Sequence, residues 1–432
     1  MNSNHSKQVG LARIQRPERL QVEWRPLALD ACLPSDHRAR LVWKYVESLD
    51  LSALYGKIRA VEGAAGRNAV DPRILLALWM FATIEGISSA RQLDRLCERD
   101  LAYLWLCGGV GVNHHLLNDF RTAHGEFLDD LLTDTIATLM HQQLITLETV
   151  AQDGMRVRAH AGSGSFRRQA TLEKYHDEAR EQVKRLREER EQGEDSTASE
   201  RRHMAARERA AREQEERIEQ ALEELDKLRK QRERHKKGSG DQARSSTTDP
   251  EARKMKMADG GYRPAYNVQF VSDGQKRMIV GVDVSSSGSD DGQMPRMHEQ
   301  VCKRYGKTPE NYLVDGGFTG HQDVTTLEQA GSRVFGPIHG EGRMRAAGKD
   351  PYARQKRDTN ETFVFRQRMA TSEAKNVYRQ RPSIAEFPNA QCRNRGLYQF
   401  RVRGRKKVKA IALLHAITFN FMRMLHLGII GT

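Results

Sequence analysis

Cysteine is scarce in this 432-residue sequence, and the five cysteines are scattered, with no Cys-x-x-Cys pair and no histidine cluster at zinc-site spacing. This pattern argues against a structural zinc site and against a framework of disulfides. We expect the thiols to be reduced and mostly to act as small core residues. The five are Cys32, Cys97, Cys107, Cys302 and Cys392.

Long hydrophobic runs are scarce too. The N-terminus lacks the apolar run of a signal peptide, and the run from Ile74 to Ile84 is too short to span a bilayer. A longer apolar stretch, 410–430, contains Asn420 and Arg423. Because such side chains are costly inside a membrane, we expect a buried, partly amphipathic helix there and no membrane contact.

Negative charge is outweighed by positive charge. The sequence has 71 Lys and Arg residues against 57 Asp and Glu residues, which gives a formal charge of +14. Such an excess favours a polyanionic partner over a small neutral substrate, and nucleic acid is the leading candidate. The length predicts two or three domains.

The N-terminal part of the chain, 27–145, has apolar residues at helix-like spacings. Ser88 or Ser89 can cap one of the expected helices, and Gly108-Gly109 breaks another. Short helices joined by tight turns suit a helix-turn-helix-like DNA-binding module. An ordinary helical bundle would give nearly the same pattern.

Aromatic residues are absent between Tyr175 and Tyr262, and most of this stretch is extremely charged. Two sets of apolar residues keep a heptad-like spacing on either side of a polar break at 193–199. This pattern predicts an antiparallel coiled-coil hairpin, and a frayed, solvated arm is the alternative. The apolar residues are Leu172, Tyr175, Ala179 and Leu186, then Ile218, Ala221, Leu225 and Leu228.

Strand-like segments stand on both sides of this charged stretch. A first strand is predicted around Asp153, a hairpin over 265–284, and further strands over 311–314 and 332–337 that alternate with helices. This order predicts an α/β ribonuclease-H-like core interrupted by a helical coiled-coil insertion and preceded by an all-α N-terminal domain. The predicted domains are 1–145 (helical, DNA-binding), 146–168 with 250–432 (core), and 169–249 (charged helical hairpin).

Two acids stand at or near the ends of predicted strands. Asp153 precedes Gly154, and Asp315 precedes Gly316. Glycine at such a point lets a backbone and a phosphate approach each other closely. A single Asp-Gly pair is most often turn chemistry, so these two acids gain meaning only from the rest of the sequence.

The C-terminal part carries a signature. Tyr378, Arg381 and Glu386 stand in YRQRPSIAE, and this segment resembles the Tyr-Arg-Glu-Lys signature of the DDE transposases of bacterial insertion sequences. Other blocks resemble the same family in order, so the resemblance runs over most of the chain. They are ISSARQLDRLCERD, LLNDFR, 152–160, 248–269, 312–317 and 394–408.

Two departures from the family pattern stand near Glu386. The lysine expected seven residues later is Arg393, which keeps the charge. Four residues separate Arg381 from Glu386, where some branches of the family have three. The helix that carries the glutamate can begin near Pro382 or near Glu386, and Pro388 then falls in its first turns.

The resemblance implies a chemistry. Asp153, Asp315 and Glu386 would be the catalytic acids and would hold two Mg²⁺ ions, which Mn²⁺ can replace, for DNA cleavage at transposon ends and strand transfer into target DNA. Tyr378 and the two arginines, Arg381 and Arg393, would contact DNA. The implied partners are the terminal inverted repeats and target DNA, bound by a homodimer in the cytoplasm, at the nucleoid.

Two alternatives stay open. One is a ribonuclease-H-like nuclease that cuts DNA without joining it, and the other is a catalytically decayed, DNA-binding coiled-coil protein. Glu361 and Glu373 compete with Glu386 for the third catalytic position. Asp290 and Asp291 are interpreted as helix capping and turn chemistry.

Overall fold

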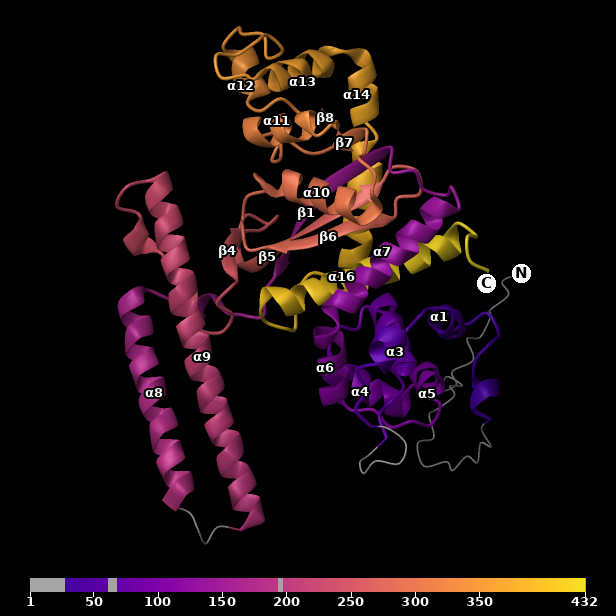
Figure 1. The fold of residues 1–432 in the computed structure, drawn as a ribbon, viewed down its shortest axis with the longest axis vertical. Helices are drawn as coiled ribbons and strands as arrows, with labels where there is room; N and C mark the ends of the chain where they lie inside the picture. Colours follow the sequence, from indigo (N-terminus) through magenta and orange to yellow (C-terminus); the bar gives the residue numbers. More distant parts are fainter. Residues whose placement is uncertain (1–27, 61–67, 193–196, 432) are drawn as a thin grey trace, which may run out of the picture.

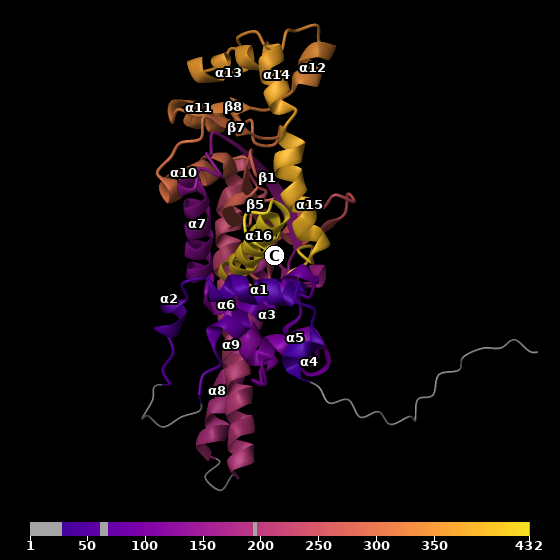
Figure 2. The same cartoon turned by 90° about the vertical axis from the view of Figure 1, so that its right-hand side faces the viewer.

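The computed structural model describes residues 28–60, 68–192 and 197–431 (Figures 1 and 2). Residues 1–27 of the predicted N-terminal domain and most of the predicted polar break at 193–199 lie outside the described residues. The structure has a helical N-terminal region, a mixed α/β sheet region and a helical hairpin that projects from the rest of the molecule.

The N-terminal region is helical, as predicted. The expected cap is present, since the Ser89 hydroxyl accepts a hydrogen bond from the Gln92 amide, and Gly108 ends a helix with a φ of +56°. The elements are η1 (Leu29–Cys32), α1 (Arg38–Glu47), α2 (Ser52–Tyr55), α3 (Pro72–Ile84), α4 (Ala90–Arg99), α5 (Leu101–Cys107), α6 (His114–Ala123) and α7 (Gly125–His141).

The sheet has the order β4-β5-β1-β7-β8, and β6 pairs with the same edge of β5 as β4, further along that strand. β1 pairs antiparallel with β5 and parallel with β7, and β8 continues parallel to β7. The strands are β1 (Thr149–Arg158), β4 (Arg253–Lys256), β5 (Tyr262–Asp273), β6 (Ile279–Ser285), β7 (Asn311–Leu313) and β8 (Arg333–Phe335). The predicted strands and the predicted hairpin are confirmed.

Helices follow the strands and continue to the C-terminus. α10 (Gln293–Tyr305) and α11 (His321–Gln329) stand at the predicted positions. The others are α12 (Glu341–Ala346), α13 (Asn360–Ala370), α14 (Ser372–Tyr378), η4 (Pro382–Glu386), α15 (Phe387–Asn394) and α16 (Arg405–His426).

α16 lies between the sheet and the N-terminal helices (Figures 1 and 2). It packs on β6, α3, α6 and α7, and the Asn420 side chain bonds both the amide and the carbonyl of Ile279. By length and composition this helix could cross a membrane, but most of it is buried inside the protein. The predicted buried helix is therefore confirmed, and one hydrophobic core runs from the N-terminal helices into the sheet.

The hairpin, which we call the arm, consists of α8 (Gln169–Gln192) and α9 (Ala198–His235) running antiparallel (Figure 1). A pair of short strands, β2 (Phe166–Arg167) and β3 (Ser245–Ser246), closes its base. Its apolar contacts form two small clusters, one around Leu172 and Leu225 and one around Leu186. Such sparse clusters fit the sparse seam in the sequence.

All five cysteines are free thiols, as expected. Cys97, Cys107 and Cys392 are buried, and the other two are partly buried. The three buried thiols therefore act as small core residues.

Candidate active site

The predicted acids come together just after the point where the parallel pairing of β1 and β7 ends. β1 and β7 are parallel neighbours in which Ala151 is opposite Leu313. Two residues further along each strand direction, Asp153 and Asp315 therefore reach the same level. Glu386, at the end of η4, approaches them from the C-terminal helices.

Arg381 lies between the three acids and holds them together. One guanidinium nitrogen, Nη2, is 3.0 Å from Oδ1 of Asp153 and 3.8 Å from Oδ2 of Asp315. The other, Nη1, donates to Oε1 of Glu386 at 3.1 Å. The Arg381 side chain is only 8% exposed, whereas that of Glu386 is 58% exposed. A buried cation thus neutralises carboxylates that would otherwise repel one another.

Asp153 is the most enclosed of the three acids. Its Oδ1 accepts hydrogen bonds from the Gly154 amide and from Arg381, and its Oδ2 accepts one from Asn389 at 2.9 Å. The pKa of Asp153 is raised to about 6: burial raises it most and the nearby Asp315 charge adds to this, while Arg381, Asn389 and the Gly154 amide lower it. The Asp153 carboxylate is therefore ionised at neutral pH and becomes protonated in mild acid.

A π-helical turn accounts for the unusual spacing between Arg381 and Glu386. Residues 382–386 form the π-helix η4, which continues into α15 without a break. A π-turn inserts one extra residue into an α-helix, and such insertions are common at functional sites. The π-turn accommodates the extra residue, so the side chains of Arg381 and Glu386 still reach each other beside Asp153. Pro388 is the second residue of α15, directly after the π-turn.

The competing glutamates lie elsewhere. Glu373 stands in the first turn of α14 and is exposed, and Glu361 stands in the first turn of α13 and accepts a bond from Gln329. Neither forms an ion pair with Arg381. Of the three candidates for the third acid, Glu386 alone reaches the guanidinium that also binds Asp153 and Asp315.

The predicted DNA-contacting residues have different environments. Tyr378 is half-buried beside the acids; burial raises the pKa of its hydroxyl, with Arg381 opposing the shift. Arg381 is engaged by the carboxylates, so a phosphate contact would require its guanidinium to leave them. Arg393 is exposed and lines a hollow of about 320 Å³ together with three more arginines, Arg156, Arg158 and Arg263.

A fourth acid, Asp290, packs against the glycines next to the predicted catalytic acids. Its Oδ1 accepts hydrogen bonds from Asn267 at 2.7 Å and from Gln269 at 2.9 Å. A Cβ on Gly154 would overlap this oxygen, and a Cβ on Gly317 would lie 3.6 Å from Oδ2. The side chain of Asp290 therefore fills the space that Gly154 leaves open.

The capping interpretation was wrong for Asp290. The N-cap of α10 is Gly292, and the Asp290 side chain reaches back to the sheet instead. A signal for this contact was present in the sequence, because Asn267 and Gln269 are polar residues in a segment otherwise typical of a buried strand. Buried polar side chains need hydrogen-bond partners, so two of them on one strand face predict a polar residue packed against it.

The donor set at the acids fits a hard divalent cation. Three carboxylates converge there, and the buried Oδ1 of Asn389 accepts no hydrogen bond from the described residues. Mg²⁺ prefers such oxygen ligands. Within the described ranges, no group of three His, Cys, Asp or Glu side chains is arranged to hold a metal ion. At the acid cluster, the Arg381 guanidinium lies between the carboxylates.

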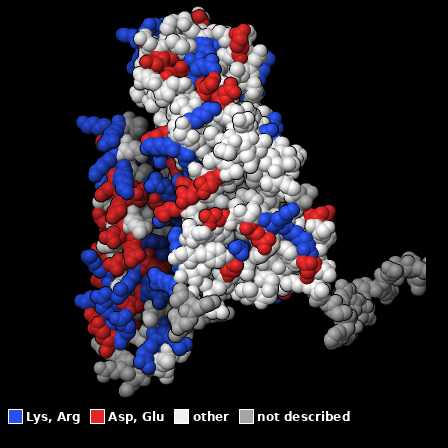
Figure 3. All heavy atoms as spheres, turned by 45° about the vertical axis from the view of Figure 1, so that its right-hand side comes forward, with Lys and Arg blue, Asp and Glu red and all other residues white. Residues whose placement is uncertain are grey.

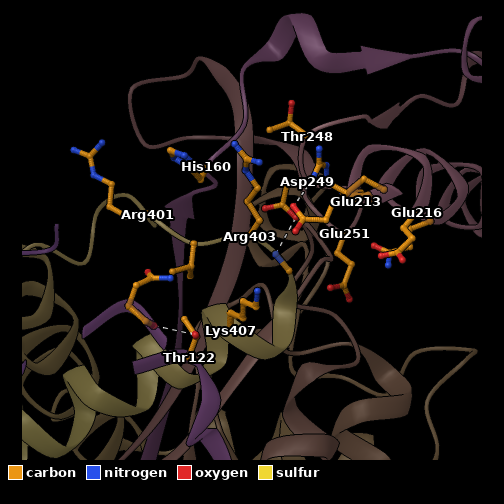
Figure 4. A pocket seen from close by; sticks show the side chains of 16 residues that line it. Thr122, His160, Glu213, Glu216, Thr248, Asp249, Glu251, Arg401, Arg403 and Lys407 are labelled. Atoms are coloured by element: carbon orange, nitrogen blue, oxygen red, sulfur yellow. Dashed lines mark hydrogen bonds and ion pairs between the residues drawn. The ribbon is translucent and has the colours of Figure 1, made fainter. Parts of the chain in front are cut away.

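A separate cavity of about 700 Å³ lies away from the acids, between α9, α6 and the segment that leads into α16 (Figure 4). Its lining has both signs of charge: Arg401, Arg403 and Lys407 on the C-terminal segment, and Glu213 and Glu216 on the arm. This mixture marks a polar junction between the arm and the body.

Two family models match the chain. One, described as a transposase domain (DUF772), matches residues 27–123, and the other, described as a transposase DDE domain, matches residues 234–421. The second match contains Asp315, Arg381 and Glu386, whereas Asp153 lies between the two matches. No curated protein and no solved structure matched the chain.

The matches agree with the architecture. A helical region followed by a mixed α/β sheet bears the two transposase descriptions in the same order. The chain belongs to the DDE transposases of insertion sequences. The family implies DNA binding, transposition activity and the use of divalent metal ions.

Proposed function

We propose that this transposase cleaves DNA at transposon ends and joins the freed 3′ ends to target DNA, with Asp153, Asp315 and Glu386 as metal ligands. The observation that carries the proposal is the convergence of these acids, from three separate segments, on one buried guanidinium. When bound, two Mg²⁺ or Mn²⁺ ions would activate the attacking oxygen and neutralise the leaving oxygen.

The residues around the acids have distinct tasks in this proposal. The Asp153 carboxylate accepts two hydrogen bonds on Oδ1 and one on Oδ2, so one lone pair of Oδ2 is left for a metal ion, and release of Arg381 would free a second one on Oδ1. Once released, the planar guanidinium of Arg381 can hold a DNA phosphate in a bidentate contact. Tyr378 lies beside the acids and would line the path of the same strand.

The strand order supports a ribonuclease-H-like core. An antiparallel hairpin (β5 and β6) lies beside β1, and two parallel strands (β7 and β8) follow on its other side. In this proposal the core comprises 146–168 and 250–432, and the arm (169–249) is a coiled-coil insertion. The helical region (1–145) would recognise the inverted repeats, and two subunits would pair on DNA to bring two ends together.

The decisive experiment replaces Glu386. Glu386→Gln keeps the shape and removes the charge, so we expect loss of metal-dependent cleavage and strand transfer while folding and DNA binding persist. Glu373→Gln is the matched control, because Glu373 is an exposed glutamate outside the acid cluster. Cleavage of transposon ends at the normal rate by Glu386→Gln, with an inactive Glu373→Gln, would show that the third acid is misassigned.

A second assay distinguishes joining from cutting. Pre-cut transposon ends with free 3′ hydroxyls are mixed with target DNA and Mn²⁺, and joined products are counted. A transposase gives joined products, and these should disappear in Glu386→Gln. Cleavage of intact ends without any joining of pre-cut ends would instead favour the nuclease alternative.

A further inference from the structure

A second cleft, distinct from the acid cluster, lies between the arm and the edge of the sheet. It has a volume of about 560 Å³ and is bordered by the end of α9, by β4, by the loop after β6 and by the start of α10. Six of its lining residues are basic and none is acidic. The basic residues are Arg232, Arg244, Arg253, Lys254, Arg296 and Arg405.

Half of these cations have a carboxylate partner just outside the cleft. Arg253 pairs with Glu224, Arg296 lies 2.9 Å from Asp283, and Arg405 lies 3.6 Å from Glu251.

The other three, Arg232, Arg244 and Lys254, are exposed. Within the part of the chain that the structure describes, they form no ion pair. Positive charge thus faces the cleft without compensation, and a cleft lined by one sign of charge concentrates ions of the opposite sign. In Figure 3, Lys and Arg atoms lie on the upper end of the arm and where it adjoins the body, with Asp and Glu atoms next to them.

The neutral lining suits phosphate oxygens. The loop Ser285-Ser286-Ser287 supplies three hydroxyls, and Gln242 and Gln293 supply amides. Hydroxyl and amide donors, together with Arg and Lys, are the groups that contact DNA phosphates. Apolar side chains in the lining are few, chiefly Phe166 and Leu228, which disfavours a protein segment anchored by hydrophobic residues.

The cleft connects to the neighbourhood of the acids. The Gly288 carbonyl, at the cleft, accepts a hydrogen bond from Arg156 at 2.9 Å. Arg156 also lines the arginine hollow with Arg393, on the helix that follows Glu386. Arg156 is also 3.5 Å from Asp290, and Arg263 in the hollow pairs with Asp259. Basic side chains therefore occur at intervals from α15 across the sheet edge to the arm, along a path that a polyanion held at the acids can follow.

We propose that this cleft binds backbone phosphates of the DNA, so that the arm and the core grip it together. The proposal rests on the proposed function, because the polyanion is the DNA that the acids would cut. It gives the base of the arm a specific role, which is to hold DNA beyond the cleavage site.

The test measures binding of the full-length protein to a labelled duplex by fluorescence anisotropy over a range of salt concentrations. The triple variant Arg232→Ala, Arg244→Ala, Lys254→Ala removes the uncompensated charges. The control variant Arg185→Ala, Arg187→Ala, Arg209→Ala removes the same charge from exposed positions elsewhere on the arm. We expect the cleft variant to bind at least about tenfold more weakly, with a salt slope smaller by about two to three, and the control to change little.

A labelling experiment on the unchanged protein tests the same site. We expect DNA to protect Lys254 from acetylation, while Lys184, far out on α8, stays reactive. Equal losses of affinity in the two triple variants, no loss in the cleft variant, or no protection of Lys254 by DNA would each overturn the proposal. Protection of Lys254 by polyglutamate but not by DNA would assign the cleft to an acidic protein segment instead.

The two proposals fail in different ways. If wild-type protein binds DNA with strong salt dependence and the cleft variant binds equally well, only the cleft proposal fails. If the wild-type protein shows no salt-dependent DNA binding, the proposed function fails with it.

Discussion

The arm and the acid cluster differ in the sequence separation of the residues that contact each other. In the arm, α8 packs on its immediate neighbour α9, and a Thr197–Glu200 capping box begins α9. In the acid cluster, Arg381 reaches Asp153 across 228 residues, and Asn389 reaches it across 236. The arm can therefore form from local signals, whereas the acid cluster exists only when the sheet, the loop after β7 and the π-turn have all assembled.

Among substitutions that separate the acid cluster from the arm, Arg381→Gln should have the largest effect on stability and on metal binding. Without the guanidinium, three carboxylates are left without their neutralising partner, and we expect a loss of about 3 kcal/mol in the free energy of unfolding. The same change should strengthen Mn²⁺ binding by about tenfold or more, because the metal ion no longer competes with an internal cation. Chemical denaturation with and without Mn²⁺ measures the first effect, and calorimetric titration the second.

Arg393→Gln is the matched control, since Arg393 is exposed and forms no ion pair within the described residues. Arg393→Gln should leave the free energy of unfolding and the affinity for Mn²⁺ nearly unchanged. Weaker Mn²⁺ binding in Arg381→Gln than in the wild type would contradict the idea that the guanidinium and the metal ion share the same carboxylates.

Gly154→Ala should be nearly as disruptive. The new Cβ would overlap Asp290 and crowd Gln269 and Asn267, and forced overpacking costs about 1–3 kcal/mol. Thermal unfolding measures the loss. Adding Asp290→Ala should restore part of the stability by clearing the space, and a double variant no more stable than Gly154→Ala would show that the crowding lies elsewhere.

A pH-dependent effect, which is small in acid, is expected for Asp153→Asn. Because the pKa of Asp153 is raised from 3.8 to about 6 on folding, its ionised form opposes folding; this cost is absent below pH 4 and fully present above pH 6. The Asn variant should thus be more stable than the wild type by up to about 3 kcal/mol at pH 7, and the difference should nearly vanish at pH 4. Urea unfolding at both pH values checks this, and a difference of the same size at pH 4 would contradict it.

The smallest effect on the core should follow removal of the arm. Replacing residues 172–237 with a short Gly/Ser linker should leave a cooperatively folding core, because the arm shares little apolar surface with it. The unfolding temperature should change by only a few degrees, as measured by calorimetry. An insoluble or molten product would show that the arm is an integral layer of the fold.

Much of the architecture could be predicted from the sequence. Periodicity indicated the N-terminal helices, and the strand-like segments around Asp153 and over 265–284 indicated β1 and the hairpin of β5 and β6. These features depend on neighbouring residues, which is why a single sequence reveals them. The π-turn could not be predicted in this way, because the spacing between Arg381 and Glu386 shows an extra residue but not where the helix accommodates it.

The sequence by itself determined the transposase resemblance and the position of the arm, because each depends on residues that are close together in the chain. The catalytic role of Asp153, Asp315 and Glu386 stays a prediction from that resemblance. Only the tertiary structure decided that Arg381 lies buried among the acids and that Asp290 fills the space beside Gly154. It also decided that basic residues from the arm, the sheet and α16 line one cleft. These contacts depend on which strands pair and in what register, and that pairing is fixed by packing over long distances in the chain rather than by local pattern.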